Sequence, residues 1–251
     1  MATVFEVIAE EFNEDMEAIR SLVVTFNDPQ KNLKVRIAAA NSSTLLIAAT
    51  FEEFVREMAH EYARVVVNST GSFAKLPPKL ASTAWKRTMD GLAKIRFQEE
   101  QAGAGTENVF GAARVRFSLI HDFCSGDLTQ DIYRDLIHNE NNMRPNELNS
   151  MFKVSGLSDV CKKLSDRQSI LEVFGETDGG KAHGKLINGL EDFFDRRNSI
   201  AHALNPGQSS GPAQIDNDIN LLKSFGKALC ETLDILTPKT PVVQITPLAA
   251  E

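Results

Sequence analysis

The chain has 251 residues, a net charge of −7 and 42% hydrophobic residues. This length fits one large domain or two small ones, and the apolar content is sufficient for a sizeable core. The acidic balance argues against a protein that coats nucleic acid, because nonspecific binding depends on neutralising phosphates. Any contact with RNA must then be local, through a few arginines and lysines.

Several other classes lack support in the sequence. The three cysteines, Cys124, Cys161 and Cys230, are far apart and form no CxxC pair, so neither a zinc ribbon nor a disulfide framework is indicated. Residues 1–6 have no basic stretch of the kind that begins a signal peptide. No run of about 18 apolar residues predicts a transmembrane helix. We therefore expect a cytoplasmic protein without a membrane partner.

The first two segments have the apolar spacing of amphipathic helices. Residues 4–26 carry acidic side chains on the outer face, which is typical of a solvated helix but also fits docking to a basic partner or mimicry of nucleic acid. Residues 33–68 form the longest helical pattern, with Leu45 and Leu46 expected in the core. The polar residues 41–44 predict either a kink or a cap between two helices.

The middle of the chain predicts shorter helices, over residues 80–99, 107–124, 128–138, 145–154 and 157–164. The first of these is strongly basic, and we interpret it as a solvated face or as a surface for an RNA backbone. Asn142 is a candidate cap for the helix that Pro145 opens. Residues 176–185 contain a Gly-Gly-Lys sequence that fails the phosphate-loop pattern, so a flexible loop is expected there.

The chain ends with a predicted helix over residues 213–236 and a proline-rich tail, residues 238–251, that we expect to be extended or disordered. Convincing alternating strand patterns are absent, so the predicted fold is all-α. We expect one helical domain over residues 1–237, composed of an N-terminal helix within 1–30 and a bundle core over 31–237.

One late helix combines an apolar stripe with a charge inside it. The stripe recurs at helical steps and comprises Leu186, Leu190, Phe193, Phe194, Ile200, Ala201 and Leu204. Asn205-Pro206-Gly207 then ends the helix. Arg197 lies within the stripe, where an unpaired charge would cost several kcal/mol. Arg197 is therefore either paired internally, with Glu52 or Glu53 as candidate partners, or lines a cleft or interface.

His202 follows Arg197 by five residues, which is about 140° around a helix. One helix alone does not point both side chains at one spot, whereas two such helices across a two-fold axis can. Asn198 and Ser199 precede His202 by four and three residues, so either can orient the imidazole. Arg196 follows Asp192 by four residues, where a surface salt bridge would explain it.

These residues resemble a known family. Arg197-Asn198-Ser199-Ile200-Ala201-His202 is similar to the Arg-polar-x-x-x-His signature of the HEPN superfamily. Residues 45–54, and the sequence Asn142-Met143-Arg144-Pro145 with Leu148 and Met151-Phe152, resemble its RiboL-PSP branch. The resemblance covers residues 40–235 and implies a HEPN-like helical bundle, here with additional helices and loop insertions.

The resemblance implies a metal-independent endoribonuclease that acts as a homodimer, often in toxin–antitoxin or antiviral defence with a partner protein. We expect Arg197, His202 and Asn198 to be catalytic and Ser199, Arg196 and Arg144 to bind substrate. No Asp, Glu and His cluster has metal-ligand spacing, so no metal or other cofactor is expected. The alternative is a non-catalytic HEPN-like module that binds nucleotide, RNA or a partner protein.

Overall fold

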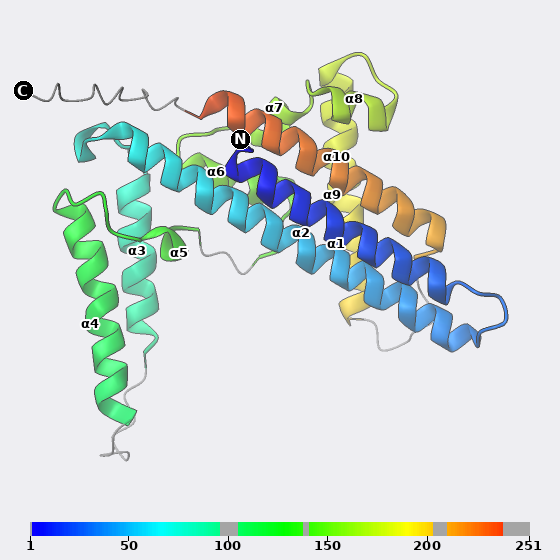
Figure 1. The fold of residues 1–251 in the computed structure, drawn as a ribbon, viewed down its shortest axis with the longest axis horizontal. Coiled ribbons are helices and arrows are strands. Elements are labelled where there is room, and N and C mark those ends of the chain that lie inside the picture. Colours follow the sequence, from blue (N-terminus) through cyan, green and yellow to red (C-terminus); the bar gives the residue numbers. More distant parts are fainter. Residues whose placement is uncertain (1, 96–104, 138–140, 203–209, 238–251) are drawn as a thin grey trace, which may run out of the picture.

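The structure, a computed structural model, describes residues 2–95, 105–137, 141–202 and 210–237, and these residues form helices and no strand (Figure 1). The elements are α1 (Val4–Phe26), α2 (Leu33–Thr70), the 3-10 helix η1 (Phe73–Lys75), α3 (Leu80–Ala93), α4 (Gly105–Cys124), α5 (Tyr133–Leu136), α6 (Pro145–Val154), α7 (Val160–Leu164), α8 (Gln168–Phe174), α9 (Gly179–His202) and α10 (Pro212–Leu236). The predicted all-α fold is confirmed. Leu204, the expected stop at 205–207 and the tail 238–251 lie outside the described residues.

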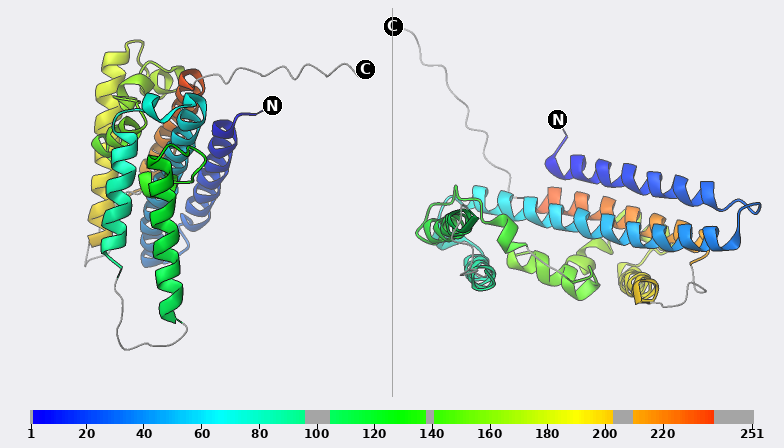
Figure 2. Two further views of the ribbon diagram at one scale, coloured as in Figure 1. Left: turned by 90° about the vertical axis from the view of Figure 1, so that its left-hand side faces the viewer. Right: turned by 90° about the horizontal axis from the view of Figure 1, so that it is seen from below.

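The helices stack in layers on the long helix α2. Helix α1 forms an outer layer over α2 and α10, and α9 lies on the opposite side with the short helices α6 to α8 (Figure 2). A capping box fixes the start of α1, because the Thr3 hydroxyl accepts from the Glu6 amide at 3.1 Å while the Glu6 carboxylate accepts from the Thr3 amide at 2.7 Å. Phe51 of α2 contacts both Phe194 of α9 and Phe225 of α10.

Helix α2 is continuous through the polar residues 41–44, so the expected kink or cap is wrong. The hydroxyls of Ser43 and Thr44 donate to the carbonyls of Ala39 and Ala40 at 2.8 and 3.1 Å, so the helix itself satisfies them when they are buried.

The prediction that Leu45 and Leu46 lie in the core is also wrong. These side chains are 37% and 47% exposed. The buried face of α2 runs instead through Thr44, Ile47 and Phe51, which sit three and four residues apart.

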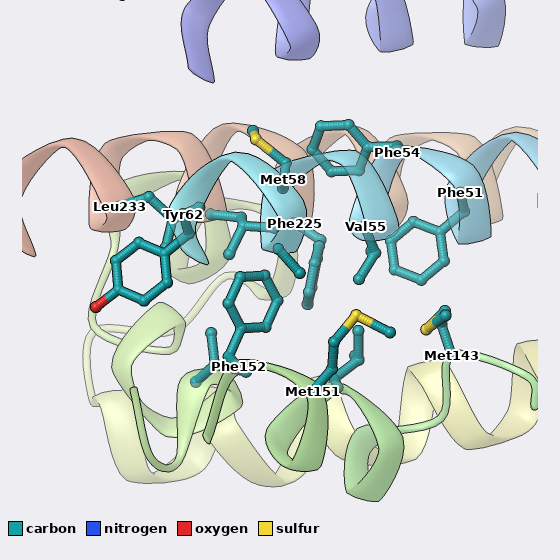
Figure 3. Packing of buried hydrophobic residues seen from close by; sticks show 14 of the residues in the cluster. Phe51, Phe54, Val55, Met58, Tyr62, Met143, Met151, Phe152, Phe225 and Leu233 are labelled. Atoms are coloured by element: carbon teal, nitrogen blue, oxygen red, sulfur yellow. The ribbon is translucent and has the colours of Figure 1, made fainter. Parts of the chain in front are cut away.

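The core joins α2 to α6 and α10. Met151 and Phe152 of α6 point toward Val55 and Tyr62 of α2 (Figure 3). Met143, which precedes α6, is fully buried beside them. The segment before α6 is thereby anchored close to α2 and α9.

Several predicted bounds in the middle of the chain are wrong. Helix α3 ends at Ala93, the helix expected over 128–138 has only four residues, α7 begins at Val160, and α8 was not predicted. The flexible loop expected at 176–185 is helical from Gly179 onward. The carboxylate of Asp178 accepts from the Lys181 amide at 2.8 Å, and Ala182 is buried, which together start α9 early.

Helices α3 and α4 pack side by side and project from one end of the bundle as an arm, called here the α3–α4 arm (Figures 1 and 2). Asp135 of α5 attaches it, accepting from Nε of Arg116 at 2.8 Å and from the Thr88 hydroxyl at 3.1 Å. A second cation, Arg87, donates to the carbonyl of Leu136. Within the described part of the chain, no helix has the length and apolarity needed to cross a membrane.

Candidate functional site

The site is built on the C-terminal half of α9. Leu186, Leu190, Phe193 and Phe194 are fully buried, as the stripe predicted. Ile200 is half-buried and Ala201 is exposed, so the prediction of a buried Ala201 is wrong. Residues 195–198 still contact α10 and the segment before α6, whereas Ser199, Ala201 and His202 in the last turn of α9 are exposed.

Arg197 is half-buried and lies between the buried Phe194 and the exposed Ala201. Its Nη1 donates to Oδ1 of Asn198 at 3.1 Å, and its Nε is buried without a hydrogen-bond partner. Glu52 of α2 is the inward-facing carboxylate, with its side chain 13% exposed, whereas Glu53 is 66% exposed and pairs with Arg56 at 2.9 Å. The structure thus selects Glu52 between the two candidates.

Burial raises the pKa of the Glu52 carboxyl, and the positive charges of Arg197 and Arg56 oppose that rise. Nη2 of Arg56 lies 3.4 Å from Oε2 of Glu52, whereas Arg197 acts on Glu52 electrostatically without a direct ion pair. One carboxylate oxygen of Glu52 is buried and has no hydrogen-bond partner. Glu52 and Arg197 therefore each keep one unsatisfied polar atom, which leaves the guanidinium incompletely bound in this structure.

The segment before α6 docks on α9 beside the motif. Nδ2 of Asn142 donates to Oδ1 of Asn198 at 2.9 Å. Arg144 donates to Glu191 and, at 2.6 Å, to Asp195. The expected capping role of Asn142 is wrong, because Arg144 is the N-cap residue of α6 and makes no side-chain cap bond. Two of the three segments that resembled the family, the motif and the segment before α6, thus meet in one place.

Neither predicted partner holds the imidazole of His202. The Ser199 hydroxyl donates to the backbone carbonyl of Asp195 at 2.9 Å, and Asn198 is engaged with Arg197 and Asn142. Ser199 and His202 are both exposed. The Asn198 side chain therefore links Arg197 to the segment before α6.

Arg196 is engaged on the other side of α9. Its Nη2 donates at 2.5 Å to Oδ1 of Asp218 in α10, a residue only 3% exposed, and Gln214 donates to the same oxygen at 2.9 Å. Burial raises the pKa of the Asp218 carboxyl, and Arg196 opposes the rise. The partner of Arg196 is thus Asp218 and not the Asp192 suggested by spacing. Asp218 interrupts the apolar stripe of the last helix, and that position was the signal that it is buried.

The hydrogen bond between Asn142 and Asn198 gives a first testable prediction. We expect Asn142→Ala to lower the free energy of unfolding by about 1 kcal/mol, because one partly buried hydrogen bond is lost. Asn142→Asp should cost more, since it sets a carboxylate against the Asn198 oxygen. Urea unfolding measures both, with Asn13→Ala on α1 as the control. Equal stabilities for Asn142→Asp and the unchanged protein would contradict the contact.

No three His, Cys, Asp or Glu side chains gather in a way that could hold a metal ion within the described ranges. An all-α bundle with an Arg-Asn-x-x-x-His helix that ends in solvent defines a HEPN-type domain. A family model described as RiboL-PSP-HEPN matches residues 10–236. The chain therefore belongs to the RiboL-PSP-HEPN family, and the resemblance is confirmed. No curated protein and no solved structure matches the chain. Membership supports an RNA-related or nuclease module in general.

Proposed function

We propose that the protein is a metal-independent endoribonuclease whose active site forms between two copies of the chain. The observation that carries the proposal is the placement of Arg197 and His202. Arg197 is half-buried and held by Asn198, whereas His202 is exposed at the end of the same helix. Arg197 makes no direct ion pair and His202 makes no hydrogen bond with any residue that the structure describes, so both side chains are available to a phosphate.

The family resemblance implies the dimer, and the geometry of one helix supports it. Five residues separate the two side chains, about 140° around α9, so a single copy does not aim both at one phosphate. A two-fold axis beside the last turn of α9 would bring His202 of one copy toward Arg197 of the other. The exposed Ala201 and half-buried Ile200 give that turn an apolar surface for such a contact.

The chemistry assigns a role to each of the three residues. The ribose 2′-hydroxyl attacks the adjacent phosphorus, the 5′-oxygen leaves, and a cyclic phosphate remains. Histidine can take the proton from the attacking hydroxyl or return it to the leaving oxygen near neutral pH. Arg197 neutralises the charge that grows on the phosphate oxygens, and Asn198 fixes the orientation of the guanidinium.

The three residues predicted to bind substrate differ in availability. Ser199 is exposed next to the motif residues. Arg144 and Arg196 already contact carboxylates, so binding phosphate would require them to exchange these partners. We therefore keep Ser199 as the substrate-contacting candidate and propose that Arg144 and Arg196 first serve to position α9.

The family resemblance also suggests the biological setting. We propose a toxin–antitoxin or antiviral role, in which a partner protein restrains the nuclease. The alternative is a non-catalytic module that binds nucleotide, RNA or a partner protein. It would have the same helical fold, but His202 would take part in no reaction.

Incubation with RNA in excess EDTA tests the proposal. We expect cleavage of a single-stranded RNA, with 2′,3′-cyclic phosphate ends, and no cleavage of the same sequence as DNA, which lacks the attacking hydroxyl. His202→Ala protein purified in parallel controls for a contaminating nuclease. Cleavage of DNA, or dependence on a divalent ion, would contradict the mechanism. RNA binding without cleavage would favour the non-catalytic module.

A further inference from the structure

One face of α4 combines aromatic and cationic side chains in solvent. Phe110, Arg114, Phe117 and His121 are spaced by four, three and four residues, so they share one face of the helix. Phe110 and Phe117 are 54% and 43% exposed, and Arg114 and His121 are exposed as well. At 1.5 Å per residue the stripe is about 16 Å long. It is therefore a surface track of a length that suits an extended ligand.

The neighbouring helix α3 adds a tryptophan to this track. Trp85 is 39% exposed, and its ring centroid lies 6.3 Å from that of Phe117 with an interplanar angle of 64°. The Phe117 ring lies 6.0 Å from His121. Large aromatic side chains normally favour burial, so two contacting rings at this exposure form a candidate binding surface.

The arm also differs in charge from the rest of the molecule. Helices α3 and α4 together hold four lysines and arginines against three carboxylates, a net charge of +1 in a chain whose total is −7. Arg87 and Arg116 use their charges to attach the arm to α5. Arg114 is exposed and makes no ion pair with any residue that the structure describes. It remains available to a negatively charged ligand.

We propose that the α3–α4 arm binds single-stranded RNA, with bases stacking on Trp85 and Phe117 and a phosphate paired to Arg114. Aromatic platforms beside cations bind single strands with little sequence preference. A second copy of the chain is a poorer occupant, because it would bring two positively charged arms together. The inference rests on the proposed function only in taking RNA as the substrate, and it assigns the arm the role of holding the strand outside the cleavage site.

Trp85 is the single tryptophan of the chain, so its fluorescence reports this contact directly. Titrating His202→Ala protein, which leaves RNA intact, with an oligouridine should quench the emission. Phe117→Ala should raise the Kd about five- to a hundredfold, the range found for losing one stacked base. Arg114→Ala should weaken binding and reduce the slope of log K against log salt by about 0.7, the value for one phosphate on a single strand.

Two matched controls define the result that would overturn the proposal. Val115→Ala removes an apolar side chain that is 60% exposed but lies off the stripe, and Lys34→Ala removes a cation on α2. Equal effects of Phe117→Ala and Val115→Ala would overturn the stacking role, as would RNA binding without quenching. A change of oligomeric state in Phe117→Ala, measured by sedimentation, would instead show that the stripe is an interface between copies, and would also overturn the proposal.

Failure of this inference is distinguishable from failure of the proposed nuclease. If the unchanged protein binds oligouridine with quenching but never cleaves RNA, the arm is confirmed as an RNA-binding element and the nuclease proposal fails. If the protein cleaves RNA in EDTA and Phe117→Ala and Arg114→Ala leave both the Kd and the cleavage rate unchanged, the arm inference fails and the nuclease stands.

Discussion

His202→Ala and Arg197→Ala should each reduce RNA cleavage by about two to four orders of magnitude, and mixing the two inactive proteins should restore it. The size of this reduction follows from the usual contribution of a positioned proton-transfer group and of a preorganised charge at the reacting centre. Activity should return in the mixture because the active site is shared between subunits, and a heterodimer contains one intact Arg197 and one intact His202 in opposite subunits. The measurement is the initial cleavage rate of a labelled RNA in EDTA.

The mixing experiment separates a shared site from two independent ones. If each copy used its own arginine and histidine, both subunits of the heterodimer would lack one group, and activity would stay lost. Heterodimer formation must be shown separately, by pull-down of differently tagged copies after exchange. Lost activity in heterodimers that do form would contradict a cleft built from one arginine and one histidine of opposite subunits.

The long helices were accessible from the sequence because their stability is local and periodic. Helices α1 and α10 bury apolar side chains at regular three- and four-residue steps, and the observed bounds fall within a residue of those predicted. The motif helix was found for the same reason. The special position of Arg197 was also predictable, because a cation within an apolar stripe must be paired or must line a cleft or interface.

The ion pairs between residues of different helices could not be predicted from the sequence, because spacing along one helix does not show which side chains a neighbouring helix places beside it. Arg196 looked like the partner of Asp192, four residues away, yet its guanidinium reaches Asp218 on α10. Arg144 looked free to bind phosphate, yet it contacts two carboxylates of α9. Both arginines pair with carboxylates of another helix, and only the packing of the bundle brings those carboxylates within reach.

Predictions from local sequence were wrong where hydrogen bonds from polar side chains stabilise a helix that the residue types disfavour. Gly179 and Gly180 favoured a loop, but the Asp178 cap and the burial of Ala182 begin the helix there. Ser43 and Thr44 suggested an interruption, but their hydroxyls bond within the helix. The exposed Leu45 and Leu46 follow from the same register, since burying Thr44 and Ile47 turns these leucines outward.

Arg196→Ala should lower the free energy of unfolding by about 2–3 kcal/mol at neutral pH. The substitution leaves the carboxylate of Asp218, 3% exposed, with Gln214 as its remaining donor. Removing one partner of a fully buried pair costs about 3–5 kcal/mol, and the 30% exposure of the Arg196 side chain reduces that figure. Urea unfolding measures the loss, and Arg64→Ala, which removes a 49% exposed side chain from its pair with Glu61, should cost about 1 kcal/mol or less.

The loss should shrink as the pH falls. Burial raises the folded-state pKa of Asp218, and removing Arg196 takes away the charge that opposed this rise. The folded state then binds a proton more tightly than the unfolded state, in which the pKa of an aspartate is about 3.9. The free energy of unfolding of the variant should therefore increase as the pH falls from the raised pKa of Asp218 toward the pKa of the unfolded state. Unfolding curves at several pH values test the sign, and a deficit that grows on acidification would contradict it.

A second substitution separates the structural role of Arg196 from a role in substrate binding. In Arg196→Ala combined with Asp218→Asn, no carboxylate is left buried, so most of the lost stability should return. If cleavage returns with it, the arginine acts by joining α9 to α10. If stability returns and the cleavage rate stays low, Arg196 contacts the RNA, as the motif alone had suggested, and the ion pair with Asp218 is the resting arrangement from which it is released.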